Sequence, residues 1–298
     1  MRMAVVKTLA YADIFDYPLT LTEINKYLIG FSLKGKKTHR SLITNIKKIP
    51  QIKESDGYYF FSGREKIVRE RKRKLIESRK KMRIARRIAR LLFYLPTIKM
   101  IAVTGNLALY NADISDDIDF LIVTQSNRIW LTRFLCVVLL KLLGVNRTPN
   151  TPTVSDKICL NMFIDENNLT LPRTEQDLYS AHEIIQAKPI LEKAGYKNIL
   201  QRSNPWVKKF LPNALVIPSE SRYASGEVEG SPRLYRGNLT SVFFNFLEYC
   251  ANKFQLFYMR SRRTTEVIRD GFLRFHPHDA RKRILKSYKN NLNKYRFL

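Results

Sequence analysis

Cysteine, tryptophan and histidine are scarce in this chain of 298 residues. The three cysteines, Cys136, Cys159 and Cys250, lie far apart in apolar surroundings, so they do not form the even, closely spaced set of a disulfide framework. We expect free thiols in a reducing compartment, which predicts a cytoplasmic protein. Glycine and proline are at ordinary levels and 45% of the residues are apolar, which excludes a disordered tail and indicates a globular protein with a proper core.

Long hydrophobic runs are also missing. The most apolar segment, residues 129–143, contains Arg133 and Lys141, whereas a spanning helix needs about 20 predominantly apolar residues. The N-terminus meets Asp13 and Asp16 before any long apolar stretch, so no export signal is expected. These absences predict a soluble protein with no membrane partner.

Basic residues form the main excess. The chain has 53 Lys and Arg against 26 Asp and Glu, which gives a formal net charge of +27. This charge exceeds what solubility requires and indicates a partner with many negative charges. Nucleic acid, either RNA or DNA, is favoured over an anionic membrane surface as this partner. The chain is also rich in Ile, Lys and Asn, so a general bias in amino-acid usage contributes to the positive charge.

The first 63 residues show the element order of a winged-helix module. Apolar residues at helical spacing predict three helices, and Thr20 with Glu23 forms the capping box that begins the second. Asp56 and Gly57 separate two apolar segments, which is the pattern of a β-hairpin turn. The predicted elements are helices over 3–16, 20–28 and 38–49 and a hairpin over 52–61.

A winged helix commonly places its third helix in the major groove of DNA and its hairpin against the backbone. Three basic residues, Lys36, Lys37 and Arg40, lie at the start of the predicted third helix. We expect them to bind nucleic acid, although a winged helix that binds only another protein fits the same pattern.

Residues 64–97 are predicted to form one long basic connecting helix. Fourteen Lys or Arg stand against three Glu between Arg64 and Arg90, and no Gly or Pro occurs before Pro96. A charge run usually covers a solvated face. Like charges at helical spacing also destabilise a helix unless an anion lies against them, so a nucleic-acid backbone along this helix is the functional interpretation. The residues expected to contact it are Arg71, Lys72, Arg73 and Lys74.

Residues 101–124 carry the candidate chemistry. They indicate an apolar strand, a turn at Gly105, a short helix and a second apolar strand that begins with aspartates. Side chains alternate along a strand, so Asp117 and Asp119 are expected on one face, where two carboxylates repel each other unless a cation lies between them. A hard cation such as Mg²⁺ suits such a pair. Gly105 permits a sharp turn, and Asn106 can cap the helix and leave N–H groups for a phosphate.

This segment resembles the DNA polymerase beta-like nucleotidyltransferase superfamily, in its small bacterial and archaeal branch. Thr104-Gly105-Asn106 and Asp117-Ile118-Asp119-Phe120 match that family's signature and spacing. The resemblance implies that Asp117 and Asp119 bind the catalytic Mg²⁺ or Mn²⁺, and that Gly105 and Asn106 hold the phosphates of a nucleoside triphosphate (NTP). Asn106 departs from the usual Ser or Gly.

The family usually places a third carboxylate on the next strand, which is predicted over 157–165. Asn161 occupies the middle of this strand, and Asp165 lies on the same face at its end. An amide can supply an oxygen ligand but cannot serve as a base. If Asn161 is the catalytic position, the enzyme works with two carboxylates and an amide, or another residue or solvent deprotonates the acceptor. An Asn that only stabilises the strand is the alternative.

The rest of the chain is predicted to be mainly helical. A long helix over 239–268 has an aromatic stripe that is expected in the core, with a base-stacking platform as the alternative, and a last basic helix is expected over 282–295. His182 is expected to be a packed or hydrogen-bonded residue, and residues 214–238 have the Gly, Ser and Pro content of a mobile loop. Further helices are expected over 175–186 and 190–200.

The expected fold is α+β. It comprises a winged helix (1–63), a long basic connecting helix (64–97), a small mixed-sheet nucleotidyltransferase core (98–205) and a helical C-terminal region (206–298).

Two functions from different classes fit these features. The first is a Mg²⁺-dependent nucleotidyltransferase that moves a nucleoside monophosphate from an NTP to an acceptor hydroxyl, with nucleic acid favoured as acceptor by the basic charge. The second is a nucleic-acid-binding or regulatory protein whose nucleotidyltransferase core is degenerate, which Asn106 and Asn161 make credible. An antitoxin-like role is a third possibility.

Overall fold

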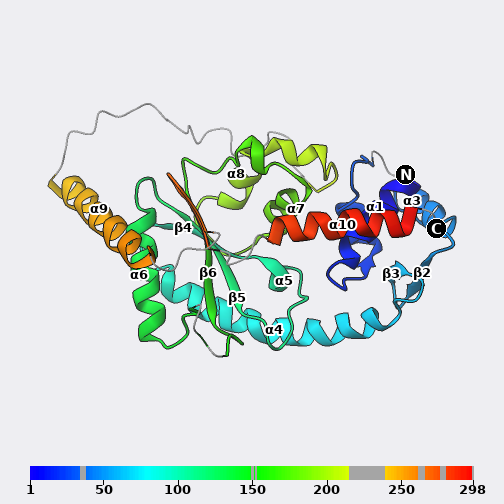
Figure 1. Cartoon of the computed structure of the whole chain (residues 1–298), viewed down its shortest axis with the longest axis horizontal. Coiled ribbons are helices and arrows are strands. Elements are labelled where there is room, and N and C mark those ends of the chain that lie inside the picture. The colour runs from blue at the N-terminus through cyan, green and yellow to red at the C-terminus, as the bar shows by residue number, and fades with distance from the viewer. Residues whose placement is uncertain are drawn as a thin grey trace.

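The chain folds into an α+β architecture with two sheets, as a computed structural model shows (Figure 1). A small N-terminal unit and a larger core lie at opposite ends of the molecule. Helices α4 (Lys66–Leu92) and α10 (Ala280–Arg296) extend between them. The structure describes residues 1–33, 38–148, 151, 153–214, 239–260, 266–275 and 280–296.

The N-terminal unit contains the predicted helices and hairpin. Thr20 and Glu23 form the capping box of α2, in which each side chain bonds the other residue's backbone N–H. A two-residue strand that was not predicted, β1 (Leu19–Thr20), pairs with β3 and completes a sheet of order β1-β3-β2. The elements are α1 (Arg2–Asp13), α2 (Leu21–Lys26), α3 (Thr38–Lys47), β2 (Ile52–Ser55) and β3 (Tyr58–Phe61).

The core is a six-stranded sheet of order β7-β4-β5-β6-β9-β8. Strands β5 and β6 are parallel, and the other neighbours are antiparallel. The two strands predicted within 101–124 and the strand predicted over 157–165 are present, and the first of them begins three residues earlier, at Ile98. The bounds are β4 (Ile98–Val103), β5 (Ile118–Thr124), β6 (Ile158–Asp165), β7 (Lys188–Glu192), β8 (Val267–Arg269) and β9 (Phe272–Arg274).

Helices cover both faces of this sheet. One apolar cluster joins the sheet to α4, α6 (Ile129–Leu142) and α9 (Leu239–Met259). A second cluster on the other face joins it to α7 (Leu178–Gln186), α8 (Tyr196–Arg202) and the 3₁₀ helix η2 (Pro205–Lys209). Tyr11 of α1 and Ile284 of α10 belong to the second cluster, so the N-terminal unit packs directly on the core. The remaining short helices are α5 (Gly105–Ala108) and η1 (Arg173–Glu175).

Two secondary-structure predictions were wrong. The helix expected over 190–200 is instead the edge strand β7 followed by α8. Pro189 is tolerated in β7 because a sheet edge does not need every backbone N–H. The helix expected over 239–268 ends at Met259, and β8 and β9 form a hairpin around Asp270-Gly271. These two strands complete the core sheet.

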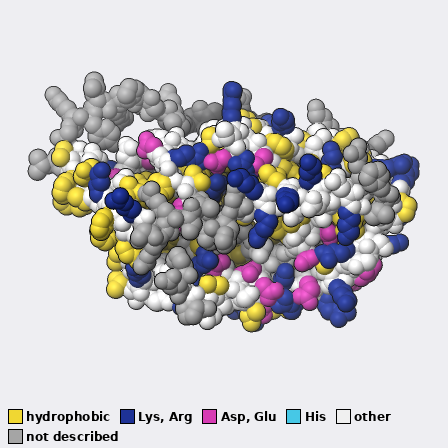
Figure 2. All heavy atoms as spheres, in the orientation of Figure 1, with side chains coloured by type: hydrophobic (Ala, Val, Ile, Leu, Met, Phe, Trp, Pro, Cys, Tyr) yellow, Lys and Arg dark blue, Asp and Glu magenta, His cyan; other side chains and the backbone are white. Residues whose placement is uncertain are grey.

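The aromatic stripe of α9 is not in the core. The helix packs on α6 through Leu247, Ala251 and Gln255, which are spaced four residues apart. Its other sides face solvent, and hydrophobic side chains gather at that end of the molecule in Figure 2. The exposed aromatic residues, each 44% to 78% exposed, are Phe243, Phe244, Phe246, Tyr249, Phe254, Phe257 and Tyr258.

The sequence also predicts that no helix crosses a membrane and that residues 214–238 form a mobile loop. Within the described part of the chain, no helix has both the length and the apolar character that crossing a membrane requires. The predicted mobile loop at 214–238 lies, except for Ala214, outside the described residues.

Candidate functional site

The two aspartates predicted to bind metal meet at the start of β5. One carboxylate oxygen of Asp117, one of Asp119 and the Sγ atom of Cys159 all lie within 4.8 Å of one another. Cys159 joins them because it is on β6 directly opposite Asp119 in the parallel pair. The alternation of side chains along β5 thus produces the convergence that the Asp-Ile-Asp spacing predicts.

Gly105 holds open the space in front of Asp119. Its φ is +60°, a left-handed conformation that favours glycine. A Cβ atom at this position would lie 3.2 Å from Oδ2 of Asp119, closer than an ordinary contact. The preceding residue, Thr104, donates its backbone N–H to the Asp119 carbonyl over 3.0 Å, which fixes the turn against β5. A larger side chain at position 105 would therefore press on the carboxylate.

Burial and mutual repulsion disfavour ionisation of the aspartate pair. Burial and the neighbouring Asp117 carboxylate both raise the pKa of Asp119. Burial also raises the pKa of Asp117, and Arg147 only partly offsets it. The Nε atom of Arg147 lies 2.9 Å from Oδ2 of Asp117, and its Nη1 donates to Sγ of Cys159 over 3.5 Å. A guanidinium thus borders the carboxylate pair.

Cys159 is a neutral thiol. Burial raises its pKa well above the ordinary value, and the two carboxylates raise it further. A protonated thiol is a poor ligand for a hard cation, which prefers oxygen. Sequence analysis missed this residue, although its alternation with Asn161 along one strand is a signal that could have identified it.

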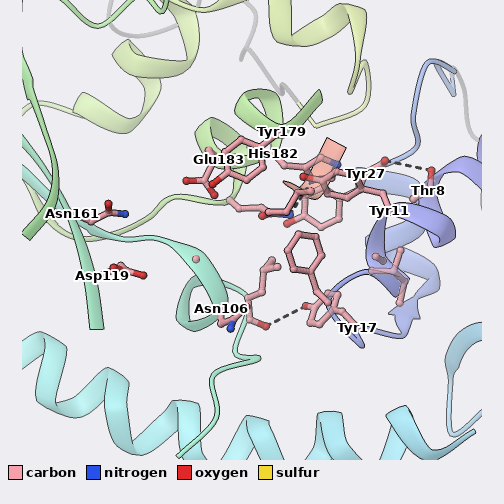
Figure 3. Close-up of a pocket in the computed structure, with 17 residues that line it drawn as sticks. Thr8, Tyr11, Tyr17, Tyr27, Asn106, Asp119, Asn161, Tyr179, His182 and Glu183 are labelled. Atoms are coloured by element: carbon pink, nitrogen blue, oxygen red, sulfur yellow. Dashed lines mark hydrogen bonds between the residues drawn. The ribbon is translucent and has the colours of Figure 1, made fainter. Parts of the chain in front are cut away.

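A cavity of about 190 Å³ adjoins the aspartates (Figure 3). Asp119 and Asn161 lie at its sheet end, α7 lines one side, and the N-terminal unit forms the far wall. Asn161 is 1% exposed, and its Oδ1 has no hydrogen-bond partner among the described residues. Residues far apart in the sequence surround this space, including Tyr11, Tyr17, Tyr27, Tyr179, His182 and Glu183.

Asn161, and not Asp165, is the polar residue of β6 at this site. Asp165 lies opposite Thr124, at the other end of the strand pair. Its carboxylate accepts hydrogen bonds from the backbone N–H of Asn127 (2.6 Å) and Asn167 (2.9 Å), so it holds a turn. Asp165 is therefore committed to structure.

Asn106 lines the cavity, but its side chain has a partner. The amide Nδ2 donates to Oδ2 of Asp116 over 3.1 Å. The same Asp116 oxygen accepts the backbone N–H of Asp113, so the acidic turn before β5 is tied to α5. The expected phosphate contact of Asn106 would require its side chain to leave Asp116.

The predicted nucleic-acid contacts differ in how available they are. Arg40 is exposed on α3. Lys72 and Arg73 are also exposed. Lys72 forms an ion pair with Asp56, and Arg73 forms ion pairs with Glu70 and Asp113. Lys74 is half-buried. Lys36 and Lys37 lie outside the described residues.

Arg71 does not belong to this exposed set. Its side chain is only 11% exposed, pairs with Glu23 at 2.7 Å and donates to the carbonyl of Pro18 at 2.7 Å. The guanidinium also lies 3.7 Å from the centre of the Tyr17 ring. Arg71 therefore attaches α4 to the N-terminal unit, and its expected contact with nucleic acid would require this ion pair to open.

No protein-family model matches this chain, and neither the curated proteins nor the solved structures contain a match. The functional interpretation therefore depends on the geometry of the site. That geometry consists of two converging carboxylates, a bordering guanidinium, a neutral thiol and an adjoining cavity.

Proposed function

We propose that this protein is a nucleotidyltransferase that depends on Mg²⁺ or Mn²⁺ and moves a nucleoside monophosphate from an NTP to an acceptor hydroxyl. The observation that carries the proposal is the convergence of Asp117 and Asp119 beside Gly105. Two carboxylates sharing one point are destabilised without a cation, and the missing side chain at Gly105 leaves room for a phosphate close to them.

The residues present fit a hard divalent cation. Asp117 and Asp119 supply carboxylate oxygens, and Oδ1 of Asn161, which has no hydrogen-bond partner within the described ranges, is a third oxygen donor at the cavity that Asp119 lines. When bound, the cation would stabilise negative charge on the phosphates during transfer. Cys159 is adjacent but, as a protonated thiol, is not expected to be a ligand.

Different groups of the chain would bind the cation, contact the phosphates, orient the site and accept the proton. Asp117 and Asp119 bind the cation, and the backbone at Gly105 approaches the phosphates closely because no Cβ intervenes. Asn161 orients the site but cannot accept a proton from the acceptor hydroxyl, since an amide is not a base. That proton would pass to solvent or to another carboxyl group of the cavity, for which Glu183 is available.

The acceptor is proposed to be a nucleic acid. The net charge of +27 favours a polyanion, and the N-terminal unit has the helix and hairpin order of a winged helix. Exposed basic side chains on α3 and α4, Arg40, Lys72 and Arg73, support contact with its backbone.

Label transfer tests the proposal. The full chain is incubated with each α-labelled NTP, Mg²⁺ or Mn²⁺, and a mixture of RNA and DNA, and transfer of label to macromolecule is measured. We expect transfer that requires the cation and is lost in Asp117→Asn and Asp119→Asn. Transfer that persists in both variants at the wild-type rate would contradict the proposed site.

One observation favours a second function, a nucleic-acid-binding or regulatory protein with a degenerate core. Arg147 already supplies positive charge to Asp117, so part of the cation's electrostatic role is filled by the chain itself. A protein of this kind binds RNA or DNA in a salt-sensitive way, without label transfer and without need of Mg²⁺. Those two results together would replace the transferase.

A further inference from the structure

The cavity beside the aspartates is built by both ends of the molecule. In Figure 3, Asp119 and Asn161 lie on the sheet, His182 and Glu183 come from α7, and Tyr11 comes from the N-terminal helices. Its volume of about 190 Å³ is far larger than one ordered water needs, which is about 10 to 15 Å³ on this measure. A space of this size between polar groups is suited to a ligand.

His182 offers a hydrogen-bond donor at the cavity wall. Its Nδ1 lies 2.9 Å from Nε2 of Gln186, and because an amide nitrogen can only donate, Nδ1 is the acceptor. The neutral ring then carries its proton on Nε2, and burial keeps it neutral by lowering the pKa of His182 to about 3. His182 is 4% exposed, and Nε2 has no partner in the described part of the chain.

Acceptors are found toward the sheet end of the same cavity. The Oδ1 atom of Asn161 is buried without a described partner, and the carboxyl groups of Asp119 and Glu183 line the space. Away from Gly105, the carboxyl group of Glu183 would repel a phosphate. The part of a ligand that lies between His182 and Glu183 must therefore be uncharged and must both donate and accept hydrogen bonds.

The remaining walls are aromatic and flat. The Tyr11 ring stacks on His182 with a centroid distance of 4.1 Å and an interplanar angle of 10°, and Tyr27 lies 5.6 Å from the same ring. The rings of Phe15 and Tyr179 also line the cavity. Aromatic walls favour a planar ring, because stacking contributes about 1 to 3 kcal/mol per base in proteins that bind unpaired bases.

We propose that the part of this cavity away from the sheet binds the base of the nucleotide, with the phosphates at its sheet end beside Gly105 and the aspartate pair. The identification of the ligand as a nucleotide rests on the proposed function. The N-terminal unit then contributes to the substrate site through Tyr11 and Tyr27, in addition to any contact it makes with nucleic acid.

Nucleosides without phosphates separate the base site from the phosphate and metal site. Binding of adenosine, guanosine, cytidine and uridine to the full chain is measured by calorimetry without divalent cation. We expect saturable binding of at least one nucleoside. The variant His182→Phe keeps a stacking ring but removes the Nε2 donor, and it should weaken that binding by about tenfold, the effect of leaving one ligand acceptor unpaired.

A second variant and a control complete the test. Ala12→Leu places bulk into the cavity from α1 and should also weaken nucleoside binding, and circular dichroism checks that both variants are folded. Asp117→Asn should leave nucleoside binding unchanged while it abolishes label transfer.

The possible outcomes distinguish this inference from the proposed function. Label transfer by a protein that binds no nucleoside, or nucleoside binding that both folded cavity variants leave unchanged, overturns the base site and leaves the transferase standing. Nucleoside binding that is weakened by both variants supports the base site. If the same protein transfers no label, the transferase fails while the base site remains.

Discussion

The two ends of the β5–β6 strand pair differ in how the fold treats a buried carboxyl group. At one end, burial raises the pKa of Asp165, and two backbone N–H groups that donate to its carboxylate offset this in part. At the other end, burial raises the pKa of Asp119 and the adjacent Asp117 raises it further. The Asp165 carboxylate that the backbone satisfies stabilises a turn, whereas no backbone N–H among the described residues donates to the carboxylate of Asp119, and the pair of Asp117 and Asp119 is the proposed cation site.

The largest expected effect contrasts these two ends directly. Asp119→Asn should reduce label transfer by at least about a hundred-fold, the scale on which losing stabilisation of developing charge slows catalysis. Asp165→Asn should leave the transfer rate within about twofold and destabilise the fold by about 1 kcal/mol, since an amide can still accept at one oxygen. Initial rates and urea unfolding measure the two quantities. Equal losses of activity in both variants would remove the distinction between the ends.

Neighbouring residues of α4 repeat the contrast for basic side chains. Arg71→Met should lower the free energy of unfolding by about 3 kcal/mol, because it leaves Glu23 without its buried partner. The matched change Lys72→Met removes only an exposed ion pair and should cost no more than about 0.5 kcal/mol. Chemical denaturation of both variants provides the comparison, and similar values would mean that Arg71 is not a structural link.

The exposed members of this helix sharpen the contrast from the binding side. The double variant Lys72→Gln/Arg73→Gln should weaken RNA or DNA binding and reduce the slope of log K against log salt concentration by roughly 1.5, as expected for two phosphate contacts. Fluorescence anisotropy at several salt concentrations measures that slope. A slope equal to that of the wild type would exclude α4 from the nucleic-acid interface.

The smallest effect concerns pH and the Arg71 link. Burial opposes ionisation of Glu23, but Arg71 outweighs it, so the pKa of Glu23 is lowered from 4.5. A carboxyl group whose pKa is lower in the folded than in the unfolded state stabilises the fold at pH values above its unfolded-state pKa. This stabilisation is lost as the pH falls and the group becomes protonated. The wild type should therefore exceed Glu23→Gln in unfolding free energy at pH 7, with the difference shrinking below about pH 4.5. A difference that stays constant down to pH 3 would contradict the link.

Elements with strong local signals were predictable from the sequence. The capping box at Thr20, the Asp56-Gly57 turn and the uninterrupted helix-forming run of α4 each depend on residues close together in the chain. Strand β7 was not predictable in the same way, because its short apolar run becomes a strand only by pairing with β4. The β8–β9 hairpin carries the Asp270-Gly271 signal, which the preceding aromatic helix pattern obscured.

The same distinction between local signals and long-range contacts applies to the candidate site. The spacing of Asp117 and Asp119 is local, so their convergence was predictable from strand alternation. The cavity brings Tyr11 against His182, a contact across most of the sequence that no local pattern encodes. Likewise, Arg71 and Lys72 are adjacent and equally charged, and only the packing of α4 against Glu23 separates a buried link from an exposed side chain.

Direct binding of a cation tests the central claim most closely. Mn²⁺ is titrated into the full chain with a non-hydrolysable NTP analogue, and the free ion is followed by electron paramagnetic resonance. We expect the wild type and Asp165→Asn to lower the free Mn²⁺ concentration below that measured with the analogue alone. The double variant Asp117→Asn/Asp119→Asn should not lower it further than the analogue does. Two results would contradict a cation site at the start of β5. Either the double variant depletes free Mn²⁺ as much as the wild type does, or the wild type depletes no free Mn²⁺ beyond the analogue alone.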